Sequence, residues 1–280
     1  MAILEIITVL LLSTALTTYA QDQEISSPQI PVCVPANLAG PNGGYLQRQK
    51  GDPGEKGDKG ERGFPGYGQK STSCPLISYH MRRLDQRTDY PRYRYYVPRM
   101  TQATACTWVE TSDYNNHATL WHYATNSHDN EFFLAFLNPT TIRMAVGGIL
   151  HDFQVKSLTR FQRLHICGWF SSSRRQIGIF INTKSISTMS YRGEIMLGGG
   201  SLLLGQEQDR VNAQRLEASQ SLSGTFTNMM IWPRVLSEDD ISNIAYKCEC
   251  PLDYAIALTL DRTELYGEAT YSIPDACPTF

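Results

Sequence analysis

The feature that most constrains the fold is a series of short apolar segments in the C-terminal three quarters of the chain. Six of them have the length and the β-branched or aromatic content of strands. They are residues 119–123, 130–137, 143–146, 164–170, 176–181 and 226–232. Many short strands without helical spacing between them are typical of an antiparallel β-sandwich. We therefore expect residues 69–280 to form an all-β, two-sheet domain.

One short helix is expected within this domain, from Ser237 to Tyr246. Ser237 is a good N-cap, and the acidic residues 238–240 fall in the first turn, where the helix dipole favours negative charge. The apolar face consists of Ile241, Ile244 and Ala245.

Glycine occupies every third position from Gly51 to Gly66. Only glycine fits the axis of a collagen triple helix, and Pro53 and Pro65 occupy the third position of their triplets, where hydroxylation stabilises it. Residues 51–68 are therefore expected to be a collagen-like stalk, with trimerisation as a hypothesis. The alternative is a glycine-rich linker that does not trimerise.

The N-terminus indicates the compartment. An apolar run from Ile6 to Leu12, followed by small residues up to Ala20, predicts a secretory signal peptide over residues 1–20, although Glu5 stands where a basic residue is usual. This run is too short to span a bilayer comfortably. Residues 21–50 are rich in Pro, Gly, Gln and Ser and are expected to be flexible. The protein is thus predicted to be secreted and extracellular, with no membrane span.

The net charge and the cysteine content limit the kinds of partner that this chain is expected to bind. A formal net charge of -2 argues against nucleic acid, which requires a basic surface. Seven cysteines in an oxidising compartment should be mostly paired, and an odd number leaves at least one free or bonded to another chain. Cys33, far from the predicted domain, is the candidate for a link between chains.

The segment from Gly198 to Gln220 carries the clearest chemistry. A short buried strand, Leu202–Leu204, leads into a loop rich in carboxylates and amides. These side chains are Glu207, Gln208, Asp209, Glu217 and Gln220. Crowded oxygen ligands suit a hard cation, above all Ca²⁺. The alternative reading of such a segment is a solvated acidic turn.

Five segments of the predicted domain carry motifs that resemble those of one known family. The segment from His165 to Ser171, His-Ile-Cys-Gly-Trp-Phe-Ser, is similar to the pentraxin signature, with Gly-Trp arriving one place early. Leu204–Asp209 resembles the family's calcium loop, and Ser127–Glu131 resembles the segment with its Asp-Asn pair. Val146–Gly148 and Met229–Ile241 also match, so that the resemblance covers roughly residues 75–275.

The resemblance implies a flattened jelly-roll of two antiparallel sheets. It also implies a disulfide between Cys106 and Cys167. Longer members tie the start of the domain to the region after the helix, so that Cys74 would pair with Cys248 or Cys250. The remaining one of these two would meet Cys277, and the sequence leaves this choice open.

The resemblance further implies the calcium ligands. For a first ion they are Asp129, Asn130, Glu207, Gln208 through its backbone carbonyl, and Asp209. Glu217 and Gln220 would serve a second ion, although one extra residue precedes Glu217. Without cations the four carboxylates would repel one another. In phosphocholine-binding pentraxins a Phe, a Thr and a Glu recognise choline. Ala135, Ala145 and Leu150 occupy these positions, so choline specificity is not expected.

The leading hypothesis is a secreted, calcium-dependent, lectin-like recognition protein of innate immunity. It would be a homo-oligomer, disulfide-linked through Cys33, and would bind anionic, phosphate-bearing or glycan ligands through calcium by avidity. The alternative is a calcium-binding structural component of extracellular matrix or biomineral. An enzyme is not expected, because the chain lacks Gly-x-Ser-x-Gly, His-Glu-x-x-His and phosphate-loop motifs.

Overall fold

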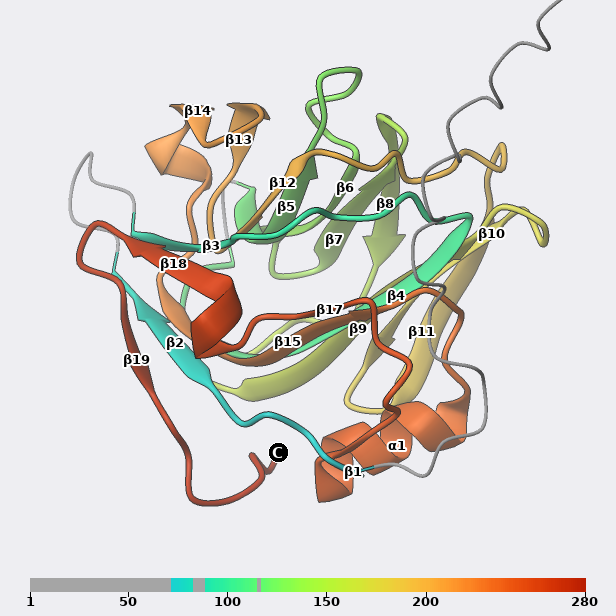
Figure 1. Ribbon diagram of the computed structural model, residues 1–280. Coiled ribbons are helices and arrows are strands. Elements are labelled where there is room, and N and C mark those ends of the chain that lie inside the picture. The colour runs from blue at the N-terminus through green and yellow to red at the C-terminus, as the bar shows by residue number, and fades with distance from the viewer. Residues whose placement is uncertain (1–71, 83–88, 115–116) are drawn as a thin grey trace, which may run out of the picture. The chain divides into compact units, whose positions relative to one another are not determined.

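The computed structural model describes residues 72–82, 89–114 and 117–280 (Figure 1). The predicted signal peptide, flexible segment, collagen-like stalk and Cys33 lie outside the described residues and stay predictions. Among the described residues, no helix combines the length and apolar character needed to cross a membrane.

Two antiparallel sheets form the domain, as the strand pattern predicted (Figure 1). The first has the order β11-β10-β9-β4-β15-β2-β19, with β17 paired to β15. Its strands are β11 (Lys184–Ser190), β10 (Gln176–Ile181), β9 (Arg163–Ser171), β4 (Gln102–Thr111), β15 (Gly224–Trp232), β2 (Ser78–Met81), β19 (Thr270–Ser272) and β17 (Ile256–Ala257).

The second sheet has seven strands in the order β18-β3-β12-β5-β6-β7-β8. They are β18 (Thr263–Tyr266), β3 (Tyr90–Tyr93), β12 (Ser201–Leu204), β5 (Ala118–Ala124), β6 (Phe132–Asn138), β7 (Thr141–Val146) and β8 (Ile149–Gln154). Neighbours such as β3 and β12 are distant in sequence, as the jelly-roll arrangement requires. Two small ribbons pair β1 (Thr72–Ser73) with β16 (Glu249–Cys250) and β13 (Gln208–Arg210) with β14 (Gln214–Leu216).

The main core lies between the two sheets, and side-chain alternation along the strands explains it. In β9, Leu164, Ile166 and Phe170 join the shared core, whereas Cys167 and Trp169 point to the other face of the sheet. Every residue of β5 is buried, because the core between the sheets covers one face and the segment after β12, with β13, packs against the strand. The fold therefore buries apolar residues on both sides of its central strands.

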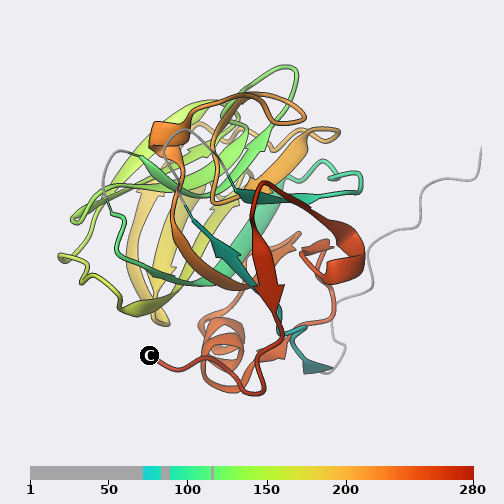
Figure 2. The same ribbon diagram turned by 90° about the vertical axis from the view of Figure 1, so that its left-hand side faces the viewer.

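The predicted helix is confirmed as α1 (Glu238–Lys247). The Ser237 hydroxyl accepts from the backbone N–H of Asp240, and the Asp240 carboxylate accepts from the backbone N–H of Ser237, which forms a capping box. The buried face packs on the outer side of the eight-stranded sheet, around Met230 and Trp232. Figures 1 and 2 show α1 on the opposite side of the domain from the β13–β14 hairpin.

Three disulfides join the described cysteines. Cys106 of β4 bonds to Cys167 of β9, its direct register partner and the partner that the family resemblance implies. Cys74 bonds to Cys250, and Cys248 bonds to Cys277. Tertiary structure thus selects between the two partners that the sequence left open for Cys74.

Some boundaries differ from the sequence predictions. The strand expected from residue 130 begins at Phe132, because Asn130 and Glu131 belong to the turn after β5. The loop expected over 205–220 contains the β13–β14 hairpin and a 3-10 turn, η1 (Ala218–Gln220). The long strand β4 was not among the predicted strands, because its Ala, Thr and Cys residues give no strong alternating pattern.

Candidate metal centre

The Asp129-Asn130 pair lies in the turn between β5 and β6, and Glu131 fixes that turn. The Glu131 side chain is fully buried. Its carboxylate accepts hydrogen bonds from the Thr125 hydroxyl (3.0 Å) and the backbone N–H of Leu197 (2.7 Å), and lies 2.8 Å from Nδ1 of His128. A buried carboxylate with three partners is a rigid support, because water cannot replace a hydrogen bond that is lost there.

The glycine turn between β7 and β8 supports the same segment from the other side. The backbone N–H of Gly148 donates to the Asn130 carbonyl (3.0 Å), and that of Gly147 donates to the Glu131 carbonyl (2.8 Å). Gly147 has a φ of +59°, and a Cβ there would lie 2.8 Å from Cβ of Glu194. The turn therefore requires glycine, both for its backbone conformation and for space.

Gln206 ties together the two sides of the loop that follows β12. Its Nε2 donates to the backbone carbonyls of Glu207 (2.8 Å) and Glu217 (3.1 Å). Its Oε1 is buried and has no hydrogen-bond partner in the described part of the chain. The residues on either side of the hairpin are thereby held close to one another.

Gln208 is buried, and its side chain is fully used within the protein. Oε1 accepts from the Ser201 hydroxyl (2.7 Å) and from the backbone N–H of Ala213 (3.0 Å). Nε2 donates to the carbonyls of Ser201 (2.8 Å) and His122 (3.2 Å). The side chain is thus not available to a cation, which leaves the backbone carbonyl as the donor that Gln208 can offer.

Glu207 is the buried acid of the site. Glu207 is only 6% exposed, and its Oε2 has no hydrogen-bond partner among the described residues. Burial and, to a smaller extent, the negative charges of the neighbouring carboxylates together raise the pKa of Glu207 to about 8. These neighbours are Asp209, Asp129 and Glu217, in decreasing order of effect. The structure therefore places all four acids within electrostatic reach of one another.

His122 lies beneath this acid. Burial lowers its pKa to about 4, against the opposing effects of its hydrogen bond with Oδ1 of Asn130 (3.2 Å) and of the Asp129 charge. Nε2 of His122 is 3.9 Å from Oε1 of Glu207. This contact is not an ion pair near neutral pH, because the lowered pKa of His122 keeps the imidazole unprotonated.

The remaining predicted ligands lie on the outside of the loop. Asp129, Asp209 and Glu217 are exposed. Glu217 precedes η1, where one carboxylate oxygen accepts from the Ser219 hydroxyl (3.1 Å) and its carbonyl accepts from the backbone N–H of Gln220 (3.0 Å). For Gln220 the structure shows this backbone contact rather than a side-chain contact with the other acids.

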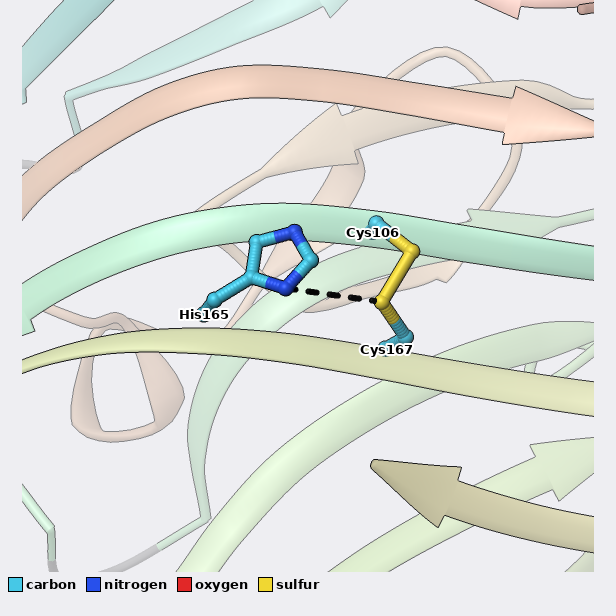
Figure 3. Close-up of side chains that lie close together, drawn as sticks. All are labelled: Cys106, His165 and Cys167. Carbon is cyan, nitrogen blue, oxygen red and sulfur yellow. Dashed lines mark hydrogen bonds between the residues drawn. A yellow bond between two sulfur atoms is a disulfide. The ribbon is translucent and has the colours of Figure 1, made fainter. Parts of the chain in front are cut away.

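A second cluster contains metal-ligating residue types but has different chemistry (Figure 3). The ligand atoms of Cys106, His165 and Cys167 all lie within 4.8 Å of one another. The two sulfur atoms form a disulfide, so neither is a thiolate that could bind a metal. Nδ1 of His165 lies 4.0 Å from Sγ of Cys167, and burial lowers the pKa of the imidazole to about 3. In the described residues, the loop carboxylates do not form a comparably tight group of three.

The donor set of the loop fits a hard divalent cation. All its candidate ligands are oxygens, and one of them, Oε2 of Glu207, is buried without a partner. A cation would neutralise the charges that raise the Glu207 pKa. Sequence reasoning identified this set but missed the supporting roles of His122, Glu131 and Gln206. Glu131 directly follows the predicted ligand Asn130, and Gln206 directly precedes the predicted ligand Glu207. This adjacency is the sequence signal that could have identified them.

The positions that correspond to the choline pocket lie on the outer face of the seven-stranded sheet. Ala135 and Ala145 are fully buried beside Phe133, whereas Leu150 is 48% exposed. Phe133 packs against His122 with ring centroids 5.3 Å apart, and so it lies outside the core between the sheets. The outer face here is apolar and provides no carboxylate at these three positions.

Comparisons with known proteins agree with this architecture. The model of the Pentaxin family matches residues 85–266. Human Pentraxin-4 is 29% identical over 178 residues, which cover 61% of this chain and 36% of that protein. Human C-reactive protein is 32% identical over 127 residues, which cover 45% of this chain and 56% of that protein. C-reactive protein 1.4 from Limulus polyphemus is 27% identical over 161 residues, covering 55% and 65%. The aligned part thus spans between 36% and 65% of these relatives.

Two solved structures share the fold. A native heptameric SAP-like pentraxin from Limulus polyphemus superposes with a TM-score of 0.65 and 19% identity, over 72% of this chain and 97% of that one. The extracellular region of zebrafish Gpr126/Adgrg6 superposes with a TM-score of 0.58 and 12% identity, over 74% and 28% respectively. At these identities the likeness concerns the fold alone.

Proposed function

The chain belongs to the pentraxin family, and from this premise we propose that it is a secreted, calcium-dependent, oligomeric recognition protein that binds anionic or glycan ligands on extracellular surfaces. The observation that carries the proposal is Glu207, a buried carboxyl with an unpartnered oxygen in the field of three other acids. A protein that maintains such an arrangement gains stability when a cation compensates it.

The residues that would hold the first calcium ion are Asp129, Asn130, Glu207, Asp209 and the carbonyl of Gln208. Bound calcium would supply positive charge and open coordination positions for ligand oxygens. The second ion would use Glu217 and Gln220. The protein itself supplies orientation, since buried hydrogen bonds fix the turn after β5 and the loop after β12.

The surface beside the candidate ligands favours oxygen-rich ligands over choline. A quaternary ammonium group would need a carboxylate or an aromatic face next to the metal-bound phosphate. Ala135 and Ala145 are buried and Leu150 is an exposed aliphatic residue. The ligand group is therefore a phosphate, a carboxylate or a set of sugar hydroxyls.

Secretion and oligomerisation complete the proposal. Three disulfides within one domain favour an oxidising compartment. One structurally similar pentraxin is heptameric, and we extend oligomerisation to this chain because a single calcium-bridged contact is weak. Several copies on one assembly would act by avidity.

Retention on immobilised phosphoryl groups tests the function. We expect the full-length secreted protein to bind a phosphorylethanolamine resin in calcium and to elute with EGTA. Asp209→Asn should reduce retention about tenfold, through loss of one charged ligand. Asp239→Asn, a matched loss of an exposed negative charge in the first turn of α1, is the control. Equal retention in calcium and EGTA would contradict the proposal.

A further inference from the structure

A polar pocket of about 260 Å³ lies beside the candidate metal centre and is lined by residues that are not among the candidate calcium ligands. Its lining is almost entirely polar, and it has two walls. Its charged wall comes from β3, β18 and the segment after β3, through Arg92, Arg94, Tyr95 and Glu264. The volume suits one sugar ring or one oxyanion rather than a larger ligand.

The charged wall carries an excess of positive charge in a fixed arrangement. Nη2 of Arg92 lies 2.7 Å from Oε2 of Glu264, which also accepts from the Tyr266 hydroxyl (2.8 Å). The Arg92 guanidinium sits over the Tyr266 ring at 4.8 Å, and that ring stacks on Tyr90 at 4.9 Å. Arg92 is thereby held from several directions and cannot collapse into the pocket.

Arg94 is the more available of the two cations. Its Nε lies 3.5 Å from Oε1 of Glu264, a longer contact than that of Arg92, and its side chain is 49% exposed. The two guanidinium groups share one carboxylate, so the wall keeps a net positive charge. Guanidinium groups bind carboxylate and sulfate in a bidentate manner, which a partly exposed Arg94 is able to do.

The opposite wall belongs to the candidate calcium loop. It consists of Ser201, at the start of β12, and Asn212, in the β13–β14 turn. The backbone N–H of Asn212 donates to the Ser201 hydroxyl (2.7 Å), which in turn donates to Oε1 of Gln208 (2.7 Å). Gln208 stands between Glu207 and Asp209, so the pocket and the candidate metal ligands share one hydrogen-bonded support.

The register of the seven-stranded sheet places both features on one face. Glu264 pairs with Arg92, Arg92 with Leu203, and Leu203 with His122. Directly paired residues of antiparallel strands point to the same side of a sheet. Arg92 and His122 are two strands apart, about 10 Å at the usual strand spacing. Since His122 lies beneath Asn130 and Glu207, one extended ligand could reach both sites.

We propose that this pocket is an oxyanion subsite for an acidic saccharide, in which Arg94, supported by Arg92, binds a carboxylate or sulfate carried on a sugar ring. Asn212, which is exposed, offers its side-chain amide to the ring hydroxyls, and the ring of Tyr95, which is 57% exposed, offers an aromatic face. The subsite itself does not depend on calcium. Its role as the second contact of a two-point site rests on the proposed function above.

Several features select this ligand class. The scarcity of apolar lining disfavours a lipid chain, and the small volume favours a single ring over a longer ligand. A sugar acid combines one negative group with several hydroxyls, which can both donate and accept hydrogen bonds. This combination matches the two arginines, the carboxylate and the amide that line this small pocket.

Calorimetric titration of the full-length protein tests the subsite. The probes are an oligogalacturonate, which carries carboxylates, dextran sulfate, which carries sulfates, and neutral dextran. Each is titrated in calcium and in EGTA. We expect Arg94→Gln to weaken binding of the charged probes about tenfold in both buffers, because a charge-assisted contact is lost. The control, Arg160→Gln, removes an exposed positive charge from the loop after β8 and should change affinity less than twofold.

The two charged probes distinguish which oxyanion the pocket prefers, and either preference supports the proposal. Equal effects of Arg94→Gln and Arg160→Gln would overturn it, as would equal binding of neutral dextran or no binding of either charged probe. If the proposed calcium function is wrong, the same titrations will give a different result. The wild-type affinity would then be the same in calcium and EGTA, while the comparison between Arg94→Gln and Arg160→Gln would still report on the pocket.

Discussion

Two clusters among the described residues contain residue types that bind metals, and they differ in what they can do. Cys106, His165 and Cys167 place their ligand atoms within 4.8 Å of one another, but the sulfurs are bonded together. The loop acids around Glu207 are less tightly grouped, yet one of their oxygens is buried without a partner. Convergence of ligand atoms is therefore a weaker sign of a metal site than an unsatisfied buried donor with compatible chemistry.

The Cys106–Cys167 disulfide of the first cluster should contribute to the stability of the fold and not to cation binding. Replacing both cysteines, Cys106→Ala with Cys167→Ala, should lower the free energy of unfolding by about 2–5 kcal/mol, because the unfolded chain is no longer crosslinked. Urea denaturation of the purified protein measures this loss. The same loss should be found in calcium and in EGTA, and a loss that depends on calcium would show that the two clusters are coupled.

The loop acids, in contrast, should make the stability of the protein depend on calcium. Calcium at about 100 times its dissociation constant should raise the free energy of unfolding by about 2.7 kcal/mol. Glu207→Gln should remove most of this gain, because it withdraws the buried negative ligand. Differential scanning calorimetry with and without chelator checks the effect, with exposed Glu238→Gln as the control. Identical melting curves for the wild type in both buffers would exclude calcium binding.

The pKa of Glu207 predicts a pH dependence for the calcium-free protein. Its pKa of about 8 lies above the ordinary value of 4.5, so the folded state keeps a proton that the unfolded state has lost. Stability should therefore fall by about 1–2 kcal/mol as pH rises from 6.5 to 8. Below pH 6.5, His122 and His165 act in the opposite direction, because the unfolded state takes up protons that the folded state excludes.

Urea denaturation in EGTA at several pH values between 6.5 and 8 measures this slope. Glu207→Gln should flatten it, and calcium should flatten it in the wild type. A slope that survives in Glu207→Gln would assign the effect to another group and would weaken the contrast between the two clusters.

The smallest expected effect concerns the support of the loop. Gln206→Leu keeps the size of the side chain but removes its hydrogen bonds to the carbonyls of Glu207 and Glu217. We expect a loss of about 1 kcal/mol in stability and a several-fold weaker affinity for calcium. Titration calorimetry measures the affinity, with exposed Gln214→Leu as the control. Unchanged affinity would mean that the loop holds its shape without Gln206.

Much of the fold could be predicted because its determinants are local. The capping box of α1 needs Ser237 and Asp240, three positions apart, and the buried strand Leu202–Leu204 follows from its apolar run. The pairing of Cys74 with Cys250 could not be predicted, because it joins positions 176 residues apart and two cysteines compete for it. Long-range choices of this kind depend on the strand order of the sheets.

The candidate site likewise has features that the sequence predicts and features that depend on the tertiary structure. The sequence by itself determined which residues could be oxygen ligands and placed them in two segments, around Asp129 and around Glu207. Only the tertiary structure decided that Glu207 is buried, because the two segments must meet over His122 before water is excluded. It also decided that Arg92 and Glu264, 172 residues apart, form one wall of a pocket. Burial and charge pairing depend on neighbours that are distant in the sequence, so the pattern of residues along the chain does not fix them.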